Sequence, residues 1–459
     1  MIDDAIALYH RLLEDDPALA RESQRVLDEG LHAEGLCFGD RPLCRVLRPH
    51  LITAEQYAQV RGACRLVIGA TIKLGAAMLR NARLMELLRL SAGERRLIAV
   101  DPGYSAVSAI SRLDAFLAGA PNGRLQDAST GEGLRFIEYN AETPAGGAYT
   151  DVLAEVFQRM PVVQRFLKEG GYALQTFEAR KSLTAVLLDC YHAWGGRGTP
   201  TIAIVDWHGV PTASEFELCR RYFAQQGLPA IIVDPRELDY HDGRLRHGER
   251  VIDLVYKRVL LSELLQREDD VRPLLQAYEE GKVCMVNSPR AKLFHKKALF
   301  ALLTDEQYQA GFSAAERAAI ARHVPWTRRV QEGYTTFEGT RVDLVALIRT
   351  QRHRFILKPN DEYGGKGVHV GWEGDDAAWD AALTEALRGD YVVQQRVPVA
   401  RAPFPALVDG ALHFQELSVD MDPFIIAGEA VGLLTRIAGT TLLNVTAGGG
   451  STVPTFVLQ

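Results

Sequence analysis

The hydrophobic positions in the first part of the chain recur at helical spacing. Apolar residues stand three or four positions apart in two stretches, Ile6 to Leu13 and Val60 to Leu79, with acidic residues and arginines between them. This spacing places apolar side chains on one face of a helix. We therefore expect residues 1–97 to form a helical N-terminal region of several segments, with packing and lid roles.

From residue 98 the pattern changes to short apolar runs separated by turns, which predict strands. One run alternates, so that Glu138, Asn140 and Glu142 project to the same face of a strand. Such a polar row is costly in a sheet unless a positive group lies against it. A magnesium ion that carries a triphosphate would satisfy the row, because Mg²⁺ takes one or two protein oxygens together with phosphate. An exposed edge strand with a solvated polar face explains the same pattern.

Residues 200–285 follow the order strand, helix, strand. The strand runs are 201–207 and 229–234, and a helical run at 214–227 lies between them. A further strand is expected at 250–259. This order predicts a Rossmann-like substrate module. Arg258, at the end of the last run, suits a substrate carboxylate, although a surface arginine gives the same pattern.

A strand at 282–287 precedes a helix that carries Lys292, Lys296 and Lys297. Positive side chains near a helix start oppose the helix dipole. Either these lysines are solvated, or an anion lies near them.

Two apolar runs, 355–357 and 368–372, are typical of a hairpin whose strands are joined by a long polar loop. The loop contains Gly364, Gly365 and Gly367, whose amides can approach an anion closely because glycine has no Cβ. It matches neither a Walker A motif nor a dinucleotide fingerprint. We interpret it as a phosphate-covering loop, while an ordinary solvated loop is the alternative.

The residues beside these glycines suit the same chemistry. Lys358, at the end of the first run, would supply a point charge to a phosphate, and Glu362 would supply a hard oxygen to Mg²⁺. Further along, the apolar run at 389–397 ends in polar residues, and we expect its backbone at 394–397 to contact a purine. A second glycine-rich loop is predicted at 444–451.

Composition narrows the class of protein. The 459 residues predict two or three modules. The net charge of −6, without a run of five basic residues, argues against a nucleic-acid partner. Six cysteines form no Cys-x-x-Cys pair, which is typical of buried thiols in a reducing compartment. Neither a secretory signal nor a membrane span is indicated, so we expect a cytoplasmic protein without a membrane partner.

Taken together, these segments resemble the ATP-grasp carboxylate-amine ligases. The resemblance is to their circularly permuted branch, which includes eukaryotic-type glutathione synthetase and the glutathionylspermidine-synthetase-like proteins, and it runs from about residue 100 to 451. It implies an α/β (α+β) fold in which the metal strand precedes the nucleotide loop. The implied parts are a helical region at 1–97, an ATP-grasp part with the metal strand at 98–199, an inserted Rossmann-like substrate module at 200–285, and a nucleotide-binding and lid region at 286–459.

The resemblance also implies a role for each matching residue. In that branch a Glu-x-Asn on one strand and the Glu of a Lys-Pro-x-x-Glu-x-Gly-Gly loop hold magnesium. A further ATP lysine of the glutathione enzyme falls at Asn287 in this chain, and Lys297 or Lys292 is the expected replacement. The implied set is Glu138, Asn140 and Glu362 for Mg²⁺; Lys358, Gly364, Gly365, Lys366, Gly367, Lys297 and Glu416 for the ATP phosphates and nucleotide; Gln394, Gln395, Arg396 and Val397 for adenine; and Arg112, Arg258 and Arg436 for substrate carboxylates and the closing loop.

The implied function is an ATP- and Mg²⁺-dependent ligase that phosphorylates a carboxylate and lets an amine displace the phosphate. Its partners would be a small-molecule or peptide carboxylate and an amine, and a homodimer is compatible with the sequence. Residues 200–285 show no match to thiol-peptide recognition, so the identity of the substrates does not transfer. Two alternatives stay open: a nucleotide-binding regulatory or scaffold protein without ligase activity, which Asn287 favours, and an ATP-grasp kinase.

Overall fold

Helices form most of the N-terminal part, as the spacing predicts. The computed structural model describes residues 2–118, 133–439 and 450–459. Asp16 caps the second helix by accepting hydrogen bonds from the backbone N–H groups of Ala18 and Leu19. The helices are α1 (Ile2–Asp15), α2 (Pro17–Glu34), α3 (Ala54–Met78), α4 (Ala82–Glu86) and α5 (Ala92–Ala99).

Short strands in the same part tie it to the end of the chain. The pattern does not predict β1 (Cys37–Phe38), β2 (Arg41–Pro42) or β3 (His50–Thr53). β3 pairs in parallel with β25 (Thr455–Leu458). The helical region therefore shares a sheet with the last strand of the molecule.

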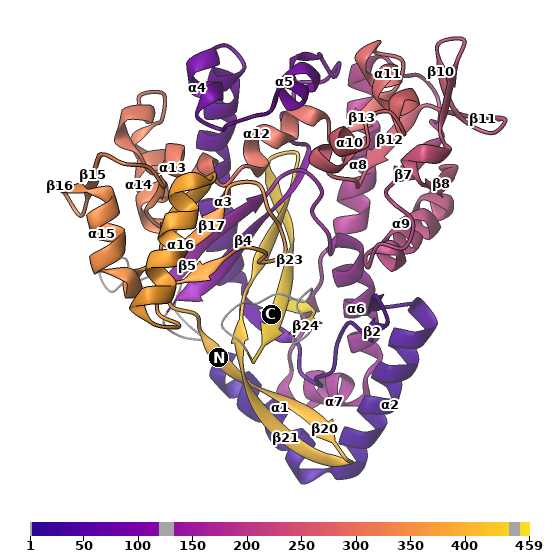
Figure 1. Ribbon diagram of the computed structural model, residues 1–459. Coiled ribbons are helices and arrows are strands. Elements are labelled where there is room, and N and C mark those ends of the chain that lie inside the picture. The colour runs from indigo at the N-terminus through magenta and orange to yellow at the C-terminus, as the bar shows by residue number, and fades with distance from the viewer. Residues whose placement is uncertain (1, 119–132, 440–449) are drawn as a thin grey trace.

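A seven-stranded sheet lies at the centre of the fold (Figure 1). Its strand order is β20-β21-β23-β22-β4-β5, and β24 pairs with β23. Early and late parts of the chain meet in it, because Arg112 of β4 lies opposite Phe424 of β22. The strands are β4 (Ile110–Ala118), β5 (Gly133–Asn140), β20 (Arg401–Val408), β21 (Ala411–Val419), β22 (Asp422–Ile426), β23 (Glu429–Ala438) and β24 (Gly450–Val453).

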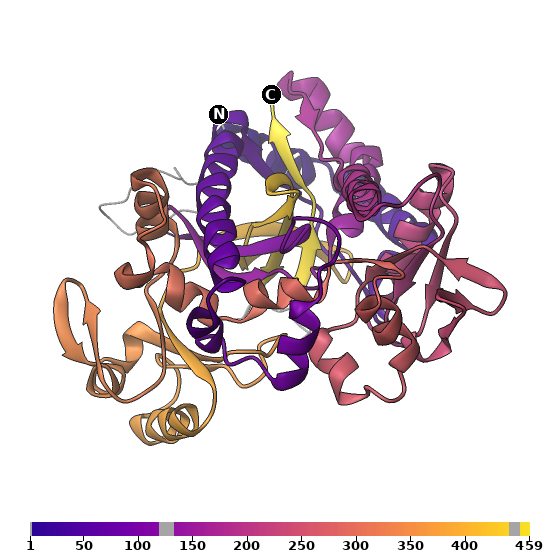
Figure 2. The same cartoon turned by 90° about the horizontal axis from the view of Figure 1, so that it is seen from above.

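Helices cover this sheet. Cys64 and Val67 of α3 belong to the same buried core as Phe136 of β5 and Leu433 of β23, and α3 lies along the sheet in the view from above (Figure 2). Burial of these apolar side chains holds the long helix against the strands. Three more helices and a short strand follow β5: α6 (Gly147–Arg159), α7 (Pro161–Gly170), β6 (Leu174–Gln175) and α8 (Ala179–Trp194).

The predicted substrate module contains a four-stranded parallel sheet in the order β13-β12-β7-β8. One expectation is wrong in detail. The run 250–259 forms two strands in different sheets, because Asp253 stands between them and accepts a hydrogen bond from the Thr201 N–H. The elements are β7 (Ile202–Val205), α9 (Ala213–Gln225), β8 (Ala230–Val233), β9 (Asp239–His241), β10 (Arg244–His247), β11 (Arg250–Ile252), β12 (Leu254–Lys257), α10 (Leu261–Gln266), α11 (Arg272–Glu279) and β13 (Cys284–Val286).

The remaining part is a lobe on the opposite side of the central sheet from the module (Figures 1 and 2). The hairpin predicted around the glycine-rich loop is confirmed, since Ile356 pairs with Val370 and Leu357 with His369. Its sheet has the order β14-β19-β17-β18. The elements are α12 (Lys292–His295), α13 (Ala298–Leu303), α14 (Ala314–His323), β14 (Thr327–Arg329), β15 (Tyr334–Phe337), β16 (Thr340–Asp343), α15 (Leu344–Thr350), β17 (Phe355–Pro359), β18 (His369–Val370), α16 (Asp376–Arg388) and β19 (Tyr391–Gln395).

The structure also shows the state of the cysteines and the lengths of the helices. All six cysteines are free thiols, and every one except the partly exposed Cys37 is buried. Within the described residues, no helix has both the length and the apolar character that a membrane crossing needs.

Candidate functional site

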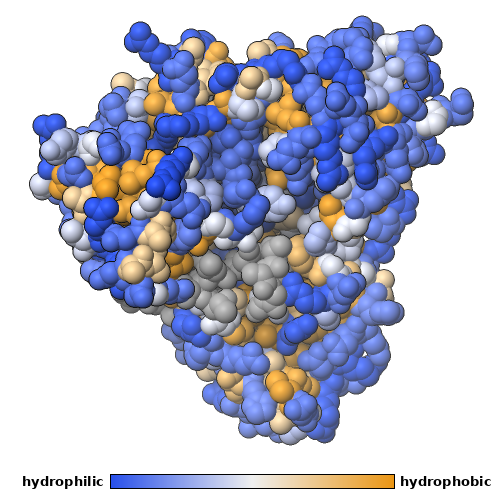
Figure 3. All heavy atoms as spheres, viewed as in Figure 1, coloured by the Kyte–Doolittle hydropathy of each residue, from blue (hydrophilic) through white to orange (hydrophobic). Residues whose placement is uncertain are grey.

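A cleft of about 510 Å³ lies between the central sheet, the module and the lobe. Three of the sheets contribute to its wall: the central sheet through β4 and β5, the parallel sheet of the module through the ends of β7 and β12, and the lobe through β17 and β19. The visible face of the molecule is hollowed between the lobe and the module, and mostly hydrophilic residues surround the hollow (Figure 3). This is the size of a small-molecule site.

Most of the residues that the sequence predicts for a site lie together in this cleft. Arg112, Glu138, Asn140, Arg258, Lys297, Lys358, Glu362, Gly364, Gly365, Lys366, Gln394, Gln395, Arg396, Val397 and Arg436 all line it. The strand at 134–143 and the loop after Lys358 therefore meet in space, although they are far apart in the sequence.

Lys358 is held at the lobe end of the cleft. Its Nζ donates hydrogen bonds to Gln394 Oε1 at 2.8 Å and to the Ile137 carbonyl at 3.2 Å. Burial lowers the pKa of Lys358 to about 8, although the nearby Glu138 carboxylate raises it. The side chain is thus a fixed, poorly solvated cation, which suits an anionic ligand.

The backbone at 394–397 lies beside Lys358, and two of the N–H groups of this segment already donate hydrogen bonds within the protein. The Gln395 N–H donates to the Trp326 carbonyl at 2.8 Å, and the Arg396 N–H donates to the Arg354 carbonyl at 2.7 Å. The guanidinium of Arg396 stacks over the Trp372 ring at 4.4 Å. Among the described hydrogen bonds none uses the Val397 N–H, so this group is the free donor of the segment.

Lys297 joins the metal strand predicted from the sequence to the glycine-rich loop. Its Nζ lies 3.0 Å from Glu138 Oε1 and also donates to the Glu362 carbonyl. Burial raises the pKa of Glu138, but Lys297 and Lys358 outweigh it and hold that pKa below its ordinary value. Two cations thus keep Glu138 ionised in a poorly solvated place.

The oxygen donors here fit a magnesium ion. In the part of the chain that the structure describes, no cluster of three or more His, Cys, Asp or Glu side chains is arranged to hold a metal. Mg²⁺ does not require one, because it takes one or two protein carboxylates and completes its shell with phosphate and water. Glu138 and Glu362 line the cleft, and Asn140 donates its Nδ2 to Asp114 at 2.8 Å, which leaves its amide oxygen for a ligand.

A buried cluster of arginines and aspartates lies next to these predicted magnesium ligands, and Asp114 of the cluster accepts the hydrogen bond from Asn140. Arg436 Nη2 lies 2.8 Å from Asp114, 2.6 Å from Asp420 and 2.8 Å from Asp422, and Arg112 donates to Asp114 at 2.7 Å. Burial raises the pKa of Asp420 to about 6, and it raises the pKa of Asp422 well above its ordinary value, despite Arg436. The pKa of Asp114 lies below its ordinary value, because the two arginines outweigh its burial. Both guanidiniums therefore serve the protein's own carboxylates.

Arg258 occupies the module end of the cleft. It is buried, which excludes the surface arginine that the sequence left open. Its guanidinium donates to the Pro144 carbonyl and to the Tyr256 hydroxyl, and it lies 3.7 Å from Glu215. The charge is fixed at the end of β12, facing the cleft.

The three lysines after residue 288 are not solvated. Lys292 and Lys296 are buried, and each lies within 2.7 Å of Asp361, at the base of the glycine-rich loop. Lys292 and Lys257 also approach Glu142, at 3.3 and 3.4 Å. The anions near these lysines are thus carboxylates of the protein, and they fasten α12 to the loop.

Two of the predicted site residues are not among those that line the cleft. Glu416 lies on the exposed part of β21, outside the cleft, whereas Asp420, which directly follows β21, lines it. β20 and β21 extend away from the cleft toward α1 and α2 (Figure 1). Gly367 is part of the loop but does not line the cleft, and its φ of +68° is a backbone conformation that favours glycine.

Two further expectations concern the same region. Asn287 is buried, and its side chain bonds to the backbone at Ala109, Ile110 and Ala141, so it has a structural role. Of the two lysines expected to replace the ATP lysine that falls at Asn287, Lys297 lines the cleft and Lys292 does not. Most of the second glycine-rich loop, residues 444–449, lies outside the described residues.

Several of the residues that line the cleft were not selected by sequence analysis. Asp206, Glu263, His295 and Tyr363 line the cleft, and so does Asp114. Asp206 carried a signal, since it directly follows a buried strand, and an acid in that position faces the end of the sheet. Nothing in the spacing of His295 separates it from the lysines of the same helix.

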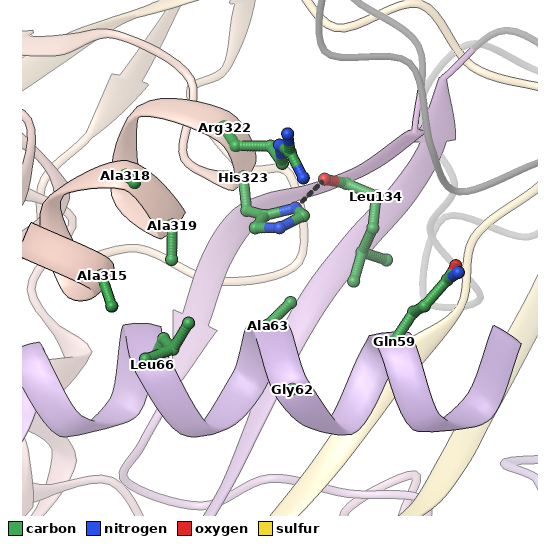
Figure 4. A pocket seen from close by; sticks show the side chains of 10 residues that line it. All are labelled: Gln59, Gly62, Ala63, Leu66, Leu134, Ala315, Ala318, Ala319, Arg322 and His323. Atoms are coloured by element: carbon green, nitrogen blue, oxygen red, sulfur yellow. Dashed lines mark hydrogen bonds between the residues drawn. The ribbon is translucent and has the colours of Figure 1, made fainter. Parts of the chain in front are cut away.

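A second cavity, of about 420 Å³, lies between α3, α14 and β5 (Figure 4). Ala63 and Leu66 face Ala319 across it, and His323 Nδ1 is hydrogen-bonded to the Leu134 carbonyl at 2.9 Å. No acidic side chain is among the described residues that line it. It therefore lacks the oxygen donors of the main cleft.

Comparisons with known proteins bear on the fold. No family model matches the sequence. An uncharacterised protein of Synechocystis sp. is 24% identical over 359 residues, which cover 72% of this chain and 67% of the relative. A glutathione synthetase-like effector from Globodera pallida superposes with a TM-score of 0.60, covering 96% of this chain and 98% of its own, at 12% identity.

Two other solved structures superpose more loosely. A Methylobacillus flagellatus protein, provisionally assigned as a gamma-glutamylcysteine synthetase, has a TM-score of 0.45, covers 89% of both chains and is 11% identical. D-cycloserine synthetase DcsG has a TM-score of 0.26, covers 56% of this chain and 72% of its own, and is 15% identical. Of these three structures, the effector is the one whose TM-score exceeds 0.5, and it is the basis for describing the fold.

The fold is thus a mixed α/β fold that is similar to that of a glutathione synthetase-like effector. The predicted fold class is confirmed. The circularly permuted order stays a prediction.

Proposed function

We propose that this protein is an ATP- and Mg²⁺-dependent carboxylate-amine ligase that works through an acyl phosphate. One observation carries the proposal: a single cleft gathers Glu138 and Asn140 of β5, the glycine-rich loop after Lys358 and the buried Arg258. The synthetase names of the structural neighbours support the same class. The substrates would be a small-molecule or peptide carboxylate and an amine, without a nucleic acid or a membrane, in a cytoplasmic protein that is compatible with a homodimer.

The lobe end would hold the nucleotide. The Val397 N–H and the carbonyls of this segment would meet the adenine, and Lys358 and Lys297 would lie on the phosphates. Both lysines are already fixed by hydrogen bonds, so little reorganisation is needed when charge develops on the transferring group. The loop amides at Gly364 and Gly365 would cover the phosphates.

Glu138, Asn140 and Glu362 would hold Mg²⁺. When bound, the ion would neutralise charge on the phosphoryl group that is transferred. In the structure Glu138 pairs with Lys297 at 3.0 Å, so the ion would share this carboxylate with the ammonium group, and the phosphates would balance both positive charges.

The module end would hold the acid. Arg258 would meet the substrate carboxylate there, because it lines the module end of the cleft and its ion pair with Glu215 is long, at 3.7 Å. Arg112 and Arg436 instead pair closely with Asp114, Asp420 and Asp422. We assign Arg112 and Arg436 the role of holding β4, β22 and β23 in place under the reacting groups. Closure of the loop over the cleft would keep water from the acyl phosphate.

The test is ADP release with ATP, Mg²⁺ and a panel of amino acids and γ-glutamyl peptides as acids, each with a panel of amines. We expect ADP and an amide in equal amounts from one pair, and loss of both in Glu138→Gln and Lys358→Met. Glu416→Gln, which alters an exposed carboxylate outside the cleft, is the matched control. ATP binding without ADP would indicate the regulatory or scaffold protein, and a phosphorylated product without amide would indicate the kinase.

A further inference from the structure

The parallel sheet of the module places two side chains at its topological switch point. From β7 the chain continues to β8 on one side, whereas β12 continues to β13 on the other. In open parallel sheets, ligands bind in the crevice outside the carboxyl ends of two such strands. Asp206 directly follows β7, Arg258 directly follows β12, and both line the cleft.

Asp206 has a carboxylate oxygen to offer. Its Oδ1 accepts a hydrogen bond from the Trp207 N–H at 2.8 Å. Among the described residues, none forms an ion pair with Asp206 or donates a hydrogen bond to its Oδ2. A carboxylate placed in a cleft with one unused oxygen is suited to take a proton from a bound ligand.

The charged groups around Asp206 are engaged elsewhere. Lys257 bonds to Glu142 and to the Val259 carbonyl, and Arg258 bonds to Pro144 and Tyr256. Glu263 of α10 accepts a hydrogen bond from the Trp207 Nε1–H at 3.1 Å. Tyr363 of the glycine-rich loop also faces this end, and burial and the carboxylates of Glu263 and Glu362 raise its pKa.

The acidity of Asp206 suits a proton acceptor near neutral pH. Burial raises the pKa of Asp206 to about 6, with Arg258 lowering it and Glu263 raising it. A base works best when its pKa lies near the working pH. His295 is less suited, because burial lowers its pKa to about 4, and Glu138 is less suited because its pKa lies below the ordinary value.

We infer that Asp206 accepts the proton of the attacking amine in the second half of the reaction, an inference that rests on the proposed function. The nitrogen lone pair forms a bond to the acyl carbon held beside Arg258. The bond from that carbon to the phosphate oxygen breaks, and phosphate leaves with the electron pair. The proton of the nitrogen moves to Oδ2 of Asp206 and passes from there to solvent.

The experiment separates the two halves of the reaction. Wild type, Asp206→Asn and Asp206→Glu receive ATP, Mg²⁺ and the acid panel. Hydroxylamine then traps the acyl phosphate, and in parallel tubes glycine, methylamine or putrescine is the amine. Asp239→Asn, an exposed carboxylate of β9 in the same module, is the control.

We expect Asp206→Asn to form hydroxamate at a rate close to that of wild type and to lose amide formation by about 10²-fold to 10⁴-fold. In wild type, amide formation should fall as the pH drops below about 6, the pKa of Asp206. This acid limb should be absent in the residual rate of Asp206→Asn and present in Asp206→Glu.

Each other outcome has a definite meaning. Amide formation by Asp206→Asn at the wild-type rate, or with an unchanged acid limb, would overturn the inference and leave the proposed function standing. Loss of hydroxamate together with amide would also overturn it, since Asp206 would then serve the binding of the acid. Absence of hydroxamate and of amide in wild type with every acid would overturn the proposed function itself.

Discussion

Lys297 and Glu138 form the contact that joins the two halves of the cleft. The Nζ of Lys297 lies 3.0 Å from Glu138 Oε1, and the same group donates to the Glu362 carbonyl. The first carboxylate belongs to a strand of the central sheet, and the second residue belongs to the loop after β17. One ammonium group thus positions the two acidic residues that we propose for magnesium.

Replacing Lys297 with methionine should impair the nucleotide end of the cleft. We expect ADP release to fall by about 10²-fold to 10³-fold, the cost of removing one group that stabilises developing charge. ATP affinity, measured by calorimetric titration, should fall as well. Lys181→Met is the control, because Lys181 pairs with Glu178 in an exposed position on the surface. Unchanged ATP affinity in Lys297→Met would contradict the assignment.

Glu142→Gln should destabilise the fold. The substitution removes the carboxylate that pairs with the buried Lys257, while Lys292 keeps Asp361 at 2.6 Å. Breaking a buried pair in this way costs about 3 to 5 kcal/mol. Urea unfolding measures this loss. Glu138→Gln, on a partly exposed side chain of the same polar row, should alter activity with a smaller effect on unfolding. Equal stability of wild type and Glu142→Gln would show that the ion pairs contribute nothing.

The effect of Glu142 should also depend on pH. Lys292 and Lys257 outweigh burial and hold the pKa of Glu142 below its ordinary value. Its stabilisation is therefore fully present above the pKa of the unfolded chain, about 4.3. It should be lost as the pH falls below that value toward the folded pKa. The difference in unfolding free energy between wild type and Glu142→Gln should shrink in the same range, and a constant difference would argue against this cause.

Nucleotide binding should weaken in alkaline solution because of Lys358. Burial lowers the pKa of this ammonium to about 8, so the charge is present below that pH and is lost above it. ATP affinity should be level near pH 7 and decline above about pH 8. Lys358→Arg keeps its charge and should remove the decline. A decline of the same size in both proteins would assign it to another group.

Arg436→Met should cost stability as well as activity. The substitution leaves Asp114, Asp420 and Asp422 around a missing cation, at a cost of about 3 to 5 kcal/mol. Burial already raises the pKa of Asp422, so neutralising it should be tolerated. Adding Asp422→Asn should recover part of the loss in a urea titration. Full stability of Arg436→Met would show that the cluster does not hold the strands.

Local patterns predicted much of the fold and of the cleft. Helical spacing identified the N-terminal helices, and the glycine-rich run identified the hairpin of β17 and β18. Strand alternation was sufficient to select Glu138 and Asn140, because both lie on one face of β5 and that face borders the cleft. Period and turn chemistry are properties of neighbouring residues, so one sequence reveals them.

Tertiary pairing decided what the sequence could not show. The resemblance implied Glu416, but that residue lies on an exposed part of β21, and the chain reaches the cleft only beyond the end of this strand, at Asp420. The sequence left open whether the lysines at 292 and 296 are solvated, because their partners, Asp361 and Glu142, belong to distant segments. The packing of whole helices and strands decides which charged residues form ion pairs. The spacing of residues along the sequence does not reveal these partners.

The fate of the substrate's oxygen tests the account most directly. An acid whose carboxylate carries oxygen-18 is incubated with wild-type protein, ATP, Mg²⁺ and amine, and the released phosphate is analysed by mass spectrometry. Through an acyl phosphate, one labelled oxygen passes from the acid to each phosphate, and Glu138→Gln should release neither ADP nor labelled phosphate. Amide formed with unlabelled phosphate would contradict the account.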